Sequence, residues 1–504
     1  MIEFSDVTFK YNITDSEGTA KESCGVKDLN LKINDGEFVV LTGFSGCGKT
    51  TVIRLINGLI PKFYNGVLTG DIVLDGRNTK DMSIYDISQK VGSVFQNPRT
   101  QFFNVNTTDE IAFAAENQCI DPKIIKSKIT DTASSMRIKK LLDRNIFNLS
   151  GGEKQMVACA GINVLSPEII VLDEPSSNLD HRAIKRLKSI LEEWKEAGKT
   201  IVIAEHRLFF LKDLADRMIV MENGEIKKEF DKSQLSALTN EECEKMGLRS
   251  LSLADMSYSR ESGKKDDNKD SNNQLEFKDF FFSYRDKKHS VSVPDLSISC
   301  GDVIAIIGHN GAGKSTLVRN ICGLEKGSKG SIVYKGEKLG NNNRLRNCYM
   351  IMQDVNHQLF TESVLDEVML SITDRKMSRE EKTLRANEIL DKLSLSEYAN
   401  VHPMALSGGQ KQRTAIASGI ASSKPIIIFD EPTSGLDLNH MYRVADLIKE
   451  LKQNGKTVLI ITHDYEFILK CCDFVIHMDE GCVKDSYKID NTSMEKLKKF
   501  IELK

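Results

Sequence analysis

The sequence LSGGEKQ at Leu149–Gln155, followed by IIVLDEPSSNLD at Ile169–Asp180, occurs a second time as LSGGQKQR at Leu406–Arg413 and IIIFDEPTSGLD at Ile426–Asp437. In each copy the serine of LSGG lies 24 positions before the glutamate of DEP (174 − 150 and 431 − 407). A serine followed by two glycines is typical of a helix N-terminus, whose free backbone N–H groups can hold an anion. The four apolar residues before DEP predict a buried strand that ends in two carboxylates. A single LSGG would indicate only a serine-capped helix, but duplication at identical spacing argues for a shared function.

A glycine-rich loop lies upstream of each copy. GFSGCGKTT at 43–51 and GHNGAGKST at 308–316 both match G-x-x-x-x-G-K-[ST], with a predicted strand before and a predicted helix after. The glycines allow several N–H groups to face a polyphosphate, the lysine reaches its terminal phosphates, and the following hydroxyl binds Mg²⁺. We therefore predict ATP and Mg²⁺ as ligands. The expected binding residues are Gly43, Ser45, Gly46, Gly48, Lys49, Thr50 and Thr51, and then Gly308, Asn310, Gly311, Gly313, Lys314, Ser315 and Thr316.

Three further positions repeat at a constant offset. Gln96, Glu174 and His206 each recur 257 residues later (353 − 96, 431 − 174, 463 − 206), whereas the loop lysine recurs after 265 (314 − 49). The chain is therefore an internal repeat of two domains. The first copy has eight extra residues between its glycine-rich loop and Gln96. We expect domains at 1–253 and 275–504, joined by a flexible polar linker at 254–274, where charged, serine and asparagine residues replace apolar ones.

Composition excludes several classes of protein. The chain has 504 residues, 28% of them charged, and a net charge of −3, which gives no general attraction for nucleic acid or anionic membranes. No apolar run approaches the ~20 residues that cross a bilayer, and the N-terminus does not resemble a signal peptide. The scattered cysteines favour reduced side chains and no zinc site. If the protein works in transport, other chains must form the channel.

The start of the chain predicts local structure. A strand should end at Tyr11 and be followed by a loop at Asn12–Gly25. LNLKINDGEFVVLTG at Leu29–Gly43 resembles a hairpin with its turn at Asn34–Gly36.

These motifs resemble those of the ATP-binding cassette family over nearly the whole chain. The resemblance implies an α/β fold of two tandem P-loop NTPase cassettes, each with a mixed β-sheet core, an antiparallel β subdomain and a helical subdomain. It implies that Asp173 and Asp430 hold Mg²⁺, that Glu174 and Glu431 act as general bases, and that His206 and His463 contact the γ-phosphate. Gln96 and Gln353 would contact Mg²⁺ or the attacking water.

In this family two cassettes pair head to tail, so each LSGG closes over the nucleotide of the other cassette. Ser150, Gly151 and Gly152 would then serve the second ATP, and Ser407, Gly408 and Gly409 the first. Tyr11 and Tyr284 are expected to stack on the adenines, with plain strand-end packing as the alternative.

Four segments narrow the resemblance to energy-coupling factor ATPases, especially fused double-cassette forms: 57–76, 94–113, AEHRL at 204–208, and 353–368. Such proteins lie on the cytoplasmic face of the membrane beneath an integral-membrane T subunit, which couples them to a substrate-binding S subunit. They import vitamins, vitamin precursors or transition-metal ions. The carboxylates expected to meet arginines of the T subunit are Asp109, Glu110, Asp366 and Glu367; the alternative is that they stabilise helix N-termini.

Two other interpretations stay open at this point. A sugar-type importer also carries two cassettes on one chain, although the second LSGGQKQR and two fully equipped sites fit it less well. A ribosome-acting translation factor also has two cassettes, but it needs a long charged helical linker. The predicted linker here is short, rich in serine and asparagine, and balanced in charge.

Overall fold

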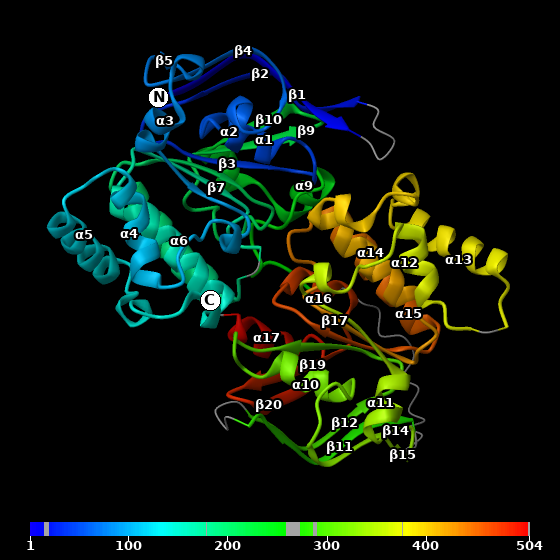
Figure 1. Ribbon diagram of the computed structural model, residues 1–504. Coiled ribbons are helices and arrows are strands. Elements are labelled where there is room, and N and C mark those ends of the chain that lie inside the picture. The colour runs from blue at the N-terminus through cyan, green and yellow to red at the C-terminus, as the bar shows by residue number, and fades with distance from the viewer. Residues whose placement is uncertain (15–19, 178, 259–272, 286–289, 375, 502–504) are drawn as a thin grey trace. The chain divides into compact units, whose positions relative to one another are not determined.

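The computed structural model describes residues 1–14, 20–177, 179–258, 273–285, 290–374 and 376–501 (Figure 1). These residues form two compact units, Met1–Ser252 and Leu253–Lys504. Most of the predicted linker, 259–272, lies outside the described residues, and Gln274 already belongs to the first strand of the second unit.

The first unit contains two sheets. The antiparallel sheet has the order β2 (Ala20–Ile33), β1 (Ile2–Thr14), β4 (Gly66–Leu74) and β5 (Arg77–Asn78). The core sheet has the order β10 (Glu225–Asp231), β9 (Arg217–Glu222), β3 (Phe38–Gly43), β8 (Thr200–Ala204), β7 (Ile169–Asp173) and β6 (Val91–Val94). Its strands are parallel except β10, which pairs antiparallel with β9. β3, β7 and β8 are buried throughout, as their continuous apolar sequences predict.

Two local predictions for the start of the chain were wrong. The expected loop at Asn12–Gly25 is mostly strand in its described part: β1 extends to Thr14, and β2 starts at Ala20, where the two residues pair. Polar residues do not prevent this pairing because the ladder is made by backbone groups. The expected hairpin at Leu29–Gly43 does not form, because β2 pairs with β1 while β3 pairs with β8 and β9 of the other sheet.

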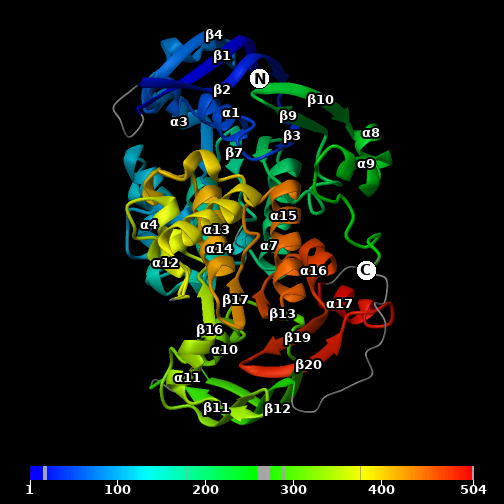
Figure 2. The same cartoon turned by 90° about the vertical axis from the view of Figure 1, so that its right-hand side faces the viewer.

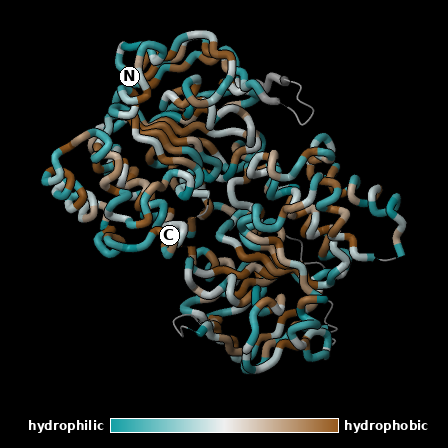
Figure 3. The backbone as a smooth tube through the Cα atoms, in the orientation of Figure 1, coloured by the Kyte–Doolittle hydropathy of each residue, from teal (hydrophilic) through white to brown (hydrophobic). Residues whose placement is uncertain are grey.

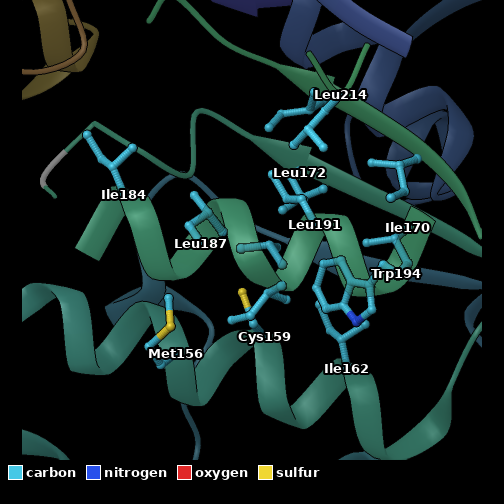
Figure 4. Close-up of a cluster of buried hydrophobic side chains, with 14 of the residues drawn as sticks. Met156, Cys159, Ile162, Ile170, Leu172, Ile184, Leu187, Leu191, Trp194 and Leu214 are labelled. Carbon is cyan, nitrogen blue, oxygen red and sulfur yellow. The ribbon is translucent and has the colours of Figure 1, made fainter. Parts of the chain in front are cut away.

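Helices cover the core sheet and form the helical subdomain of the first unit. They are α1 (Lys49–Ile56), α2 (Leu59–Lys62), α3 (Ile84–Lys90), α4 (Thr107–Asn117), α5 (Pro122–Ser135), α6 (Gly151–Leu165), α7 (His181–Glu196), α8 (Lys232–Ala237) and α9 (Asn240–Lys245). Helices α4, α5 and α6 pack together. α6 also contributes to the main core: Figure 4 shows Met156, Cys159 and Ile162 pointing toward apolar side chains of α7, with Leu172 of β7 nearby. Helix α6 therefore shares one hydrophobic core with α7 and β7.

The second unit repeats this plan in one continuous sheet. Its order is β15 (Glu337–Lys338), β14 (Lys329–Tyr334), β11 (Gln274–Ser283), β12 (Ser290–Ser299), β20 (Cys482–Lys488), β19 (Phe474–Asp479), β13 (Val303–Ile307), β18 (Thr457–Ile461), β17 (Ile426–Asp430) and β16 (Cys348–Ile351). A single bridge, Ser292 to Cys482, joins the antiparallel part to the core. The strands of both cores appear as hydrophobic bands in Figure 3.

The helices of the second unit are α10 (Lys314–Ile321), α11 (Asn341–Asn347), α12 (Val364–Ser371), α13 (Arg379–Lys392), α14 (Gly408–Ala421), α15 (Leu438–Gln453), α16 (Tyr465–Cys471) and α17 (Met494–Phe500). α15 packs on β13 and β18, and α16 lies against it (Figure 2). The predicted α/β fold of two tandem cassettes, each with a mixed core, an antiparallel part and a helical part, is confirmed.

Candidate active site

The predicted site residues of the first unit gather at one edge of its core sheet. Gly43 ends β3 and Asp173 ends β7, while Gln96 and His206 each follow a strand by two residues, β6 and β8. Because these strands are parallel, their carboxyl ends meet at the same edge, which is where open α/β sheets bind ligands. Residues distant in sequence are therefore brought together.

The glycine-rich loop has the backbone that a phosphate cradle needs. Gly48 has φ = 105°, and an added Cβ there would lie 2.5 Å from the carbonyl oxygen of Gly25. Helix α1 begins at the next residue, Lys49, so its N-terminal N–H groups face the loop. The buried Lys49 Nζ donates to the carbonyl oxygens of Gly43 and Phe44, each at 3.0 Å. Ser45 and Gly46 are exposed at the loop tip. A polyphosphate fits this cradle.

Two oxygen donors lie together beside the loop. Thr50 Oγ1 donates to Asp173 Oδ1 at 3.0 Å. Burial, and then the charge of Glu174, raise the pKa of Asp173 to about 6. A hydroxyl and a carboxylate are ligands that Mg²⁺ prefers, and a divalent cation would offset the burial that makes this carboxylate unfavourable. The residues therefore fit the predicted metal.

Glu174 is held by two neighbours. Its Oε2 accepts from Gln96 Nε2 at 2.7 Å, and its Oε1 lies 3.2 Å from His206 Nε2. Burial would raise the pKa of Glu174, but the charges of His206 and Lys49 and these hydrogen bonds outweigh it and lower the pKa. An ionised carboxylate is the form in which a residue accepts a proton from water. The pKa of Glu174 is therefore lowered, whereas that of the adjacent Asp173 is raised.

The second unit repeats this arrangement. Lys314 Nζ donates to the carbonyl oxygens of Gly308 and His309 at 2.6 and 3.1 Å, and lies 3.3 Å from His463 Nε2. Ser315 Oγ donates to Asp430 Oδ2 at 3.4 Å. The same histidine nitrogen lies 3.4 Å from Glu431 Oε1. Burial raises the pKa of Asp430 although Lys314 opposes it. The other predicted residues of this site occupy equivalent places: Gln353 follows β16, Asn310 and Gly311 lie at the exposed loop tip, and Gly313 and Thr316 flank the start of α10.

The LSGG residues start long helices in both units. Ser150 caps α6 by accepting from the N–H of Glu153, whose carboxylate accepts from the N–H of Ser150 in return. Ser407 and Gln410 form the same capping box at α14. Gly151, Gly152, Gly408 and Gly409 form the first turns of these helices. This confirms the helix starts; the binding of an anion by them stays a prediction.

The two predicted adenine-stacking tyrosines lie near the P-loop helices. The Tyr11 hydroxyl lies 3.1 Å from Thr51 Oγ1 and accepts from Arg54 Nη1 at 3.2 Å. The Tyr284 hydroxyl donates to Glu325 at 3.1 Å. Stacking on adenine stays a prediction for both.

Two of the four proposed docking carboxylates already have structural partners. Glu110 is buried and accepts from the N–H groups of Phe103 and Asn104, at 3.0 and 2.7 Å. Glu367 is likewise buried and accepts from Phe360 and Thr361. The prediction that these two residues meet a partner was wrong, because each side chain is buried and its Oε2 holds the chain that precedes its own helix. Their neighbours Asp109 and Asp366 are exposed, although Asp366 Oδ2 accepts from Ser363 Oγ at 2.6 Å.

Two buried residues beside His206 were not recognised as part of the site. Glu205 stands where the second unit has Thr462, and Arg207 stands where it has Asp464. Both contact the loop after β7. The signal in the sequence was the presence of two charged residues directly after the apolar strand β8.

The fold and the two sites define a protein with twin P-loop ATPase cassettes. A family model described as ABC transporter matches residues 26–177 and 291–434. A Treponema denticola protein named as an ABC transporter ATP-binding protein is 43% identical over 95% of this chain and 96% of its own length. A Methanosarcina mazei protein of the same name is 32% identical over 95% of this chain and 88% of its own length. The chain therefore belongs to the ABC transporter family.

As a member of this family the chain is an ATPase that binds ATP with Mg²⁺. Two solved structures match nearly the whole chain: an archaeal ribosome recycling factor in complex with a ribosomal stalk protein, and an RNase-L inhibitor. Their TM-scores are 0.65 and 0.66, the sequence identities 21% and 20%, and they cover 98% and 99% of this chain and 92% and 93% of their own. This similarity shows the shared fold. Within the described residues, no helix is long and apolar enough to cross a membrane.

Proposed function

We propose that this chain is the ATP-hydrolysing subunit of an importer of the energy-coupling factor type. It powers uptake of a vitamin, vitamin precursor or transition-metal ion through an integral-membrane T subunit and a substrate-binding S subunit, from the cytoplasmic face of the cell membrane. Relatives that match at least 95% of the chain are named as transporter ATP-binding proteins, which supports a membrane partner. The resemblance of segments 57–76 and 94–113 supports the energy-coupling factor type.

In the first site, Lys49 and the loop N–H groups bind the phosphates, and Thr50 and Asp173 hold Mg²⁺. Bound Mg·ATP supplies the electrophilic γ-phosphorus and metal-ion charge neutralisation. Glu174 accepts the proton of the attacking water, and its hydrogen bonds to Gln96 and His206 hold the carboxylate in place. The second site has the equivalent residues. We further propose that in the ATP-bound state the two cassettes pair head to tail, so that each LSGG completes the other cassette's site.

The observation that carries the membrane-partner proposal is an apolar groove in the first unit, whose lining includes Phe95 after β6. The groove has a volume of about 310 Å³ and lies between the core and the helical subdomain. Its lining includes Ile84, Phe102, Phe103 and Phe113. Phe103 stacks on Phe113 with ring centroids 4.9 Å apart, yet it is 76% exposed. Exposed aromatic residues in a groove indicate a surface that another protein covers.

The second unit exposes the same residue type at the equivalent position. Phe360 follows Phe103 by 257 positions (360 − 103) and is 74% exposed. Each phenylalanine lies a few residues before a helix whose first turn exposes an acid, Asp109 in α4 and Asp366 in α12. The partner we propose is a short helix of the T subunit that inserts apolar side chains at the phenylalanine and places a basic residue near the acid.

The experiment compares Phe103→Asp and Phe360→Asp with Ile124→Asp and Leu384→Asp, which change exposed apolar residues on α5 and α13. The first pair should lose co-purification with membrane subunits, because a carboxylate cannot enter an apolar interface without large cost. Both pairs should retain basal ATPase activity. Co-purification of all four variants would contradict the groove as the docking site. Co-purification of the wild-type chain with ribosomes would instead favour a translation factor.

A further inference from the structure

The residues on either side of the candidate site histidine, His206 or His463, differ between the units. The first unit has Glu205 and Arg207 around His206, whereas the second has Thr462 and Asp464 around His463. All four flanking side chains are buried. A buried charge is costly without polar partners, so the partners of these side chains show what each segment holds.

Glu205 joins the histidine segment to the loop that follows β7. Its Oε1 accepts from the N–H groups of His206 at 2.8 Å and Arg207 at 3.1 Å. Its Oε2 accepts from the N–H of Ser176 at 3.2 Å. Ser176 lies two residues after Glu174, so one carboxylate contacts the backbone on both sides of the Glu174–His206 pair.

Arg207 contacts the same loop from the other flank of the histidine. Its Nη1 lies 3.4 Å from the carbonyl oxygens of both Ser176 and Leu179. The loop leads to Asp180, which caps α7 by accepting from the N–H of Ala183. Glu205 therefore binds an N–H group of the loop, and Arg207 approaches its carbonyl groups.

The second unit connects the same two segments with different groups. Thr433, the equivalent of Ser176 (433 − 257), donates its hydroxyl to Asp464 Oδ2 at 2.9 Å. The N–H of Asp464 donates to Thr462 Oγ1 at 3.0 Å. In the first unit the buried Ser176 hydroxyl has no hydrogen-bond partner among the described residues. The hydroxyl that anchors the loop in one unit is thus unused in the other, where charged side chains replace it.

We propose that Glu205 and Arg207 are positioning residues that tie His206 to Ser176 and Leu179 in the loop after β7, and so set the turnover of the first ATP site. Asn178 of this loop lies outside the described residues. Thr462 and Asp464 serve the second site in the same way. The inference rests on the proposed assignment of His206 to the ATP site. Neither Glu205 nor Arg207 contacts Lys49 or the glycine-rich loop in any described interaction, so they act on the geometry of His206 and Glu174 and leave ATP affinity unchanged.

The test transplants the second unit's residues into the first. Glu205→Thr, Arg207→Asp and the double variant are made in a Glu431→Gln background, in which turnover reports the first site. Glu205→Thr leaves Arg207 without the neighbouring carboxylate, and Arg207→Asp leaves two buried carboxylates beside the histidine. Each single change should lower kcat about ten- to hundredfold by misplacing catalytic groups, with KM for ATP little changed.

The double variant recreates the Thr-His-Asp sequence and gives the Ser176 hydroxyl an acceptor. It should recover kcat to within about threefold of the background, a non-additivity that independent residues do not show. The reciprocal pair, Thr462→Glu with Asp464→Arg, should behave likewise in a Glu174→Gln background. If a background has no measurable turnover, the same variants are compared in the otherwise unchanged chain.

Single variants that retain full kcat, or a double variant as impaired as the worse single, would overturn the inference. If thermal unfolding shows that the single variants do not fold, Glu205→Gln is the deciding variant, because its amide keeps only one acceptor oxygen. A lowered kcat at unchanged KM would then support the positioning role. An unchanged kcat would refute it. Normal turnover of His206→Ala in the same background would instead refute the proposed role of the histidine itself.

Discussion

Asp173 and Glu174 are adjacent, yet their surroundings shift the two pKa values in opposite directions. Asp173 is next to one hydroxyl and another carboxylate, so burial dominates and raises its pKa to about 6. Glu174 has the positive charges of His206 and Lys49 nearby, which outweigh burial. Separation of pKa values between neighbouring acids commonly accompanies a division of roles. Here the raised pKa of Asp173 is consistent with a carboxylate that binds a cation, and the lowered pKa of Glu174 with one that accepts a proton.

The base assignment predicts a specific loss of activity. Glu174→Gln and Glu431→Gln should each lower turnover at the affected site by about 10²–10⁴, the usual contribution of a general base. ATP binding should persist, because the lysine and the glycine-rich loop are unchanged. Steady-state hydrolysis and equilibrium nucleotide binding measure the two effects. Near-normal turnover of the doubly substituted protein would remove both residues from the chemistry.

Asp173 predicts a pH dependence of stability in the protein free of metal and nucleotide. Its folded-state pKa of about 6 lies above the ordinary value of 3.8, so between these pH values the folded protein holds a proton that the unfolded chain releases. The free energy of unfolding should therefore fall as the pH rises through this window, by up to about 3 kcal/mol. Asp173→Asn cannot titrate and should lack this component in denaturant titrations. Parallel pH profiles for the two proteins would contradict the shift.

Motif residues were predictable from sequence because their chemistry fixes their spacing. The loop lysines begin the predicted helices, and the aspartates end the predicted strands. What could not be predicted was how a side chain is used locally. Glu110 looked like a surface acid after a helix start, and only the fold shows that the chain at Phe103–Asn104 turns back onto its carboxylate. Arg207 stands out as a charge after an apolar strand, but its partners lie on a loop that follows a different strand, and the sequence does not show which loop that is.

At the scale of elements, α4 shows why neighbouring acids have different roles. The helix is capped by Asn106, which accepts from the N–H of Thr108, and Glu110 holds the segment before it. Glu110→Ala should therefore destabilise the first unit by about 1–3 kcal/mol, because two N–H groups lose their acceptor. Asp109→Ala changes an exposed residue and should cost less than about 0.5 kcal/mol.

Thermal unfolding and co-purification together separate these roles. Asp109→Ala should weaken association with membrane subunits at unchanged stability, whereas Glu110→Ala should do so only through lost stability. Glu110→Gln retains one acceptor oxygen and should lie between wild type and alanine in unfolding. Equal unfolding behaviour of the two alanine variants would contradict the structural role of Glu110.

Element predictions succeeded where apolar runs were continuous and failed where pairing depended on distant strands. β7 and β17 follow directly from their apolar sequences and are confirmed. The turn at Asn34 exists, with the Glu37 N–H donating to its carbonyl oxygen, but the strands that it separates belong to different sheets. A local turn signal does not specify which partner each strand pairs with, because those partners lie up to about 180 residues away.

At the scale of the whole molecule, the repeat was predictable because one offset, 257 residues, relates most motifs. The eight extra residues of the first half fall in two places. The offset falls from 265 at the loop lysine to 260 at Gly70 and Gly330, so five of the extra residues precede Gly70 (265 − 260). The other three (260 − 257) lie between Gly76 and the end of α3. The first group contains α2 and the second a short helical turn at Thr79–Asp81. Neither interrupts a strand of the core sheet, which is why the two sites keep equivalent geometry.

The proposed head-to-tail pairing makes a prediction that no single cassette would. Ser150 and Lys314 belong to different units but would serve one ATP, whereas Ser407 would serve the other. Lys314→Ala combined with Ser150→Arg places both changes at one site, so the second change should add little. Lys314→Ala combined with Ser407→Arg damages both sites, and turnover should nearly vanish, since one lost donor to a developing charge typically costs about 3–4 kcal/mol of transition-state stabilisation. ATP hydrolysis of the two double variants, with trapping of labelled nucleotide at each site by vanadate, distinguishes the arrangements. The reversed pattern is near-complete loss of turnover with Ser150→Arg and little further loss with Ser407→Arg. It would mean that each LSGG acts within its own cassette, because a second change at an already inactive site has little left to remove.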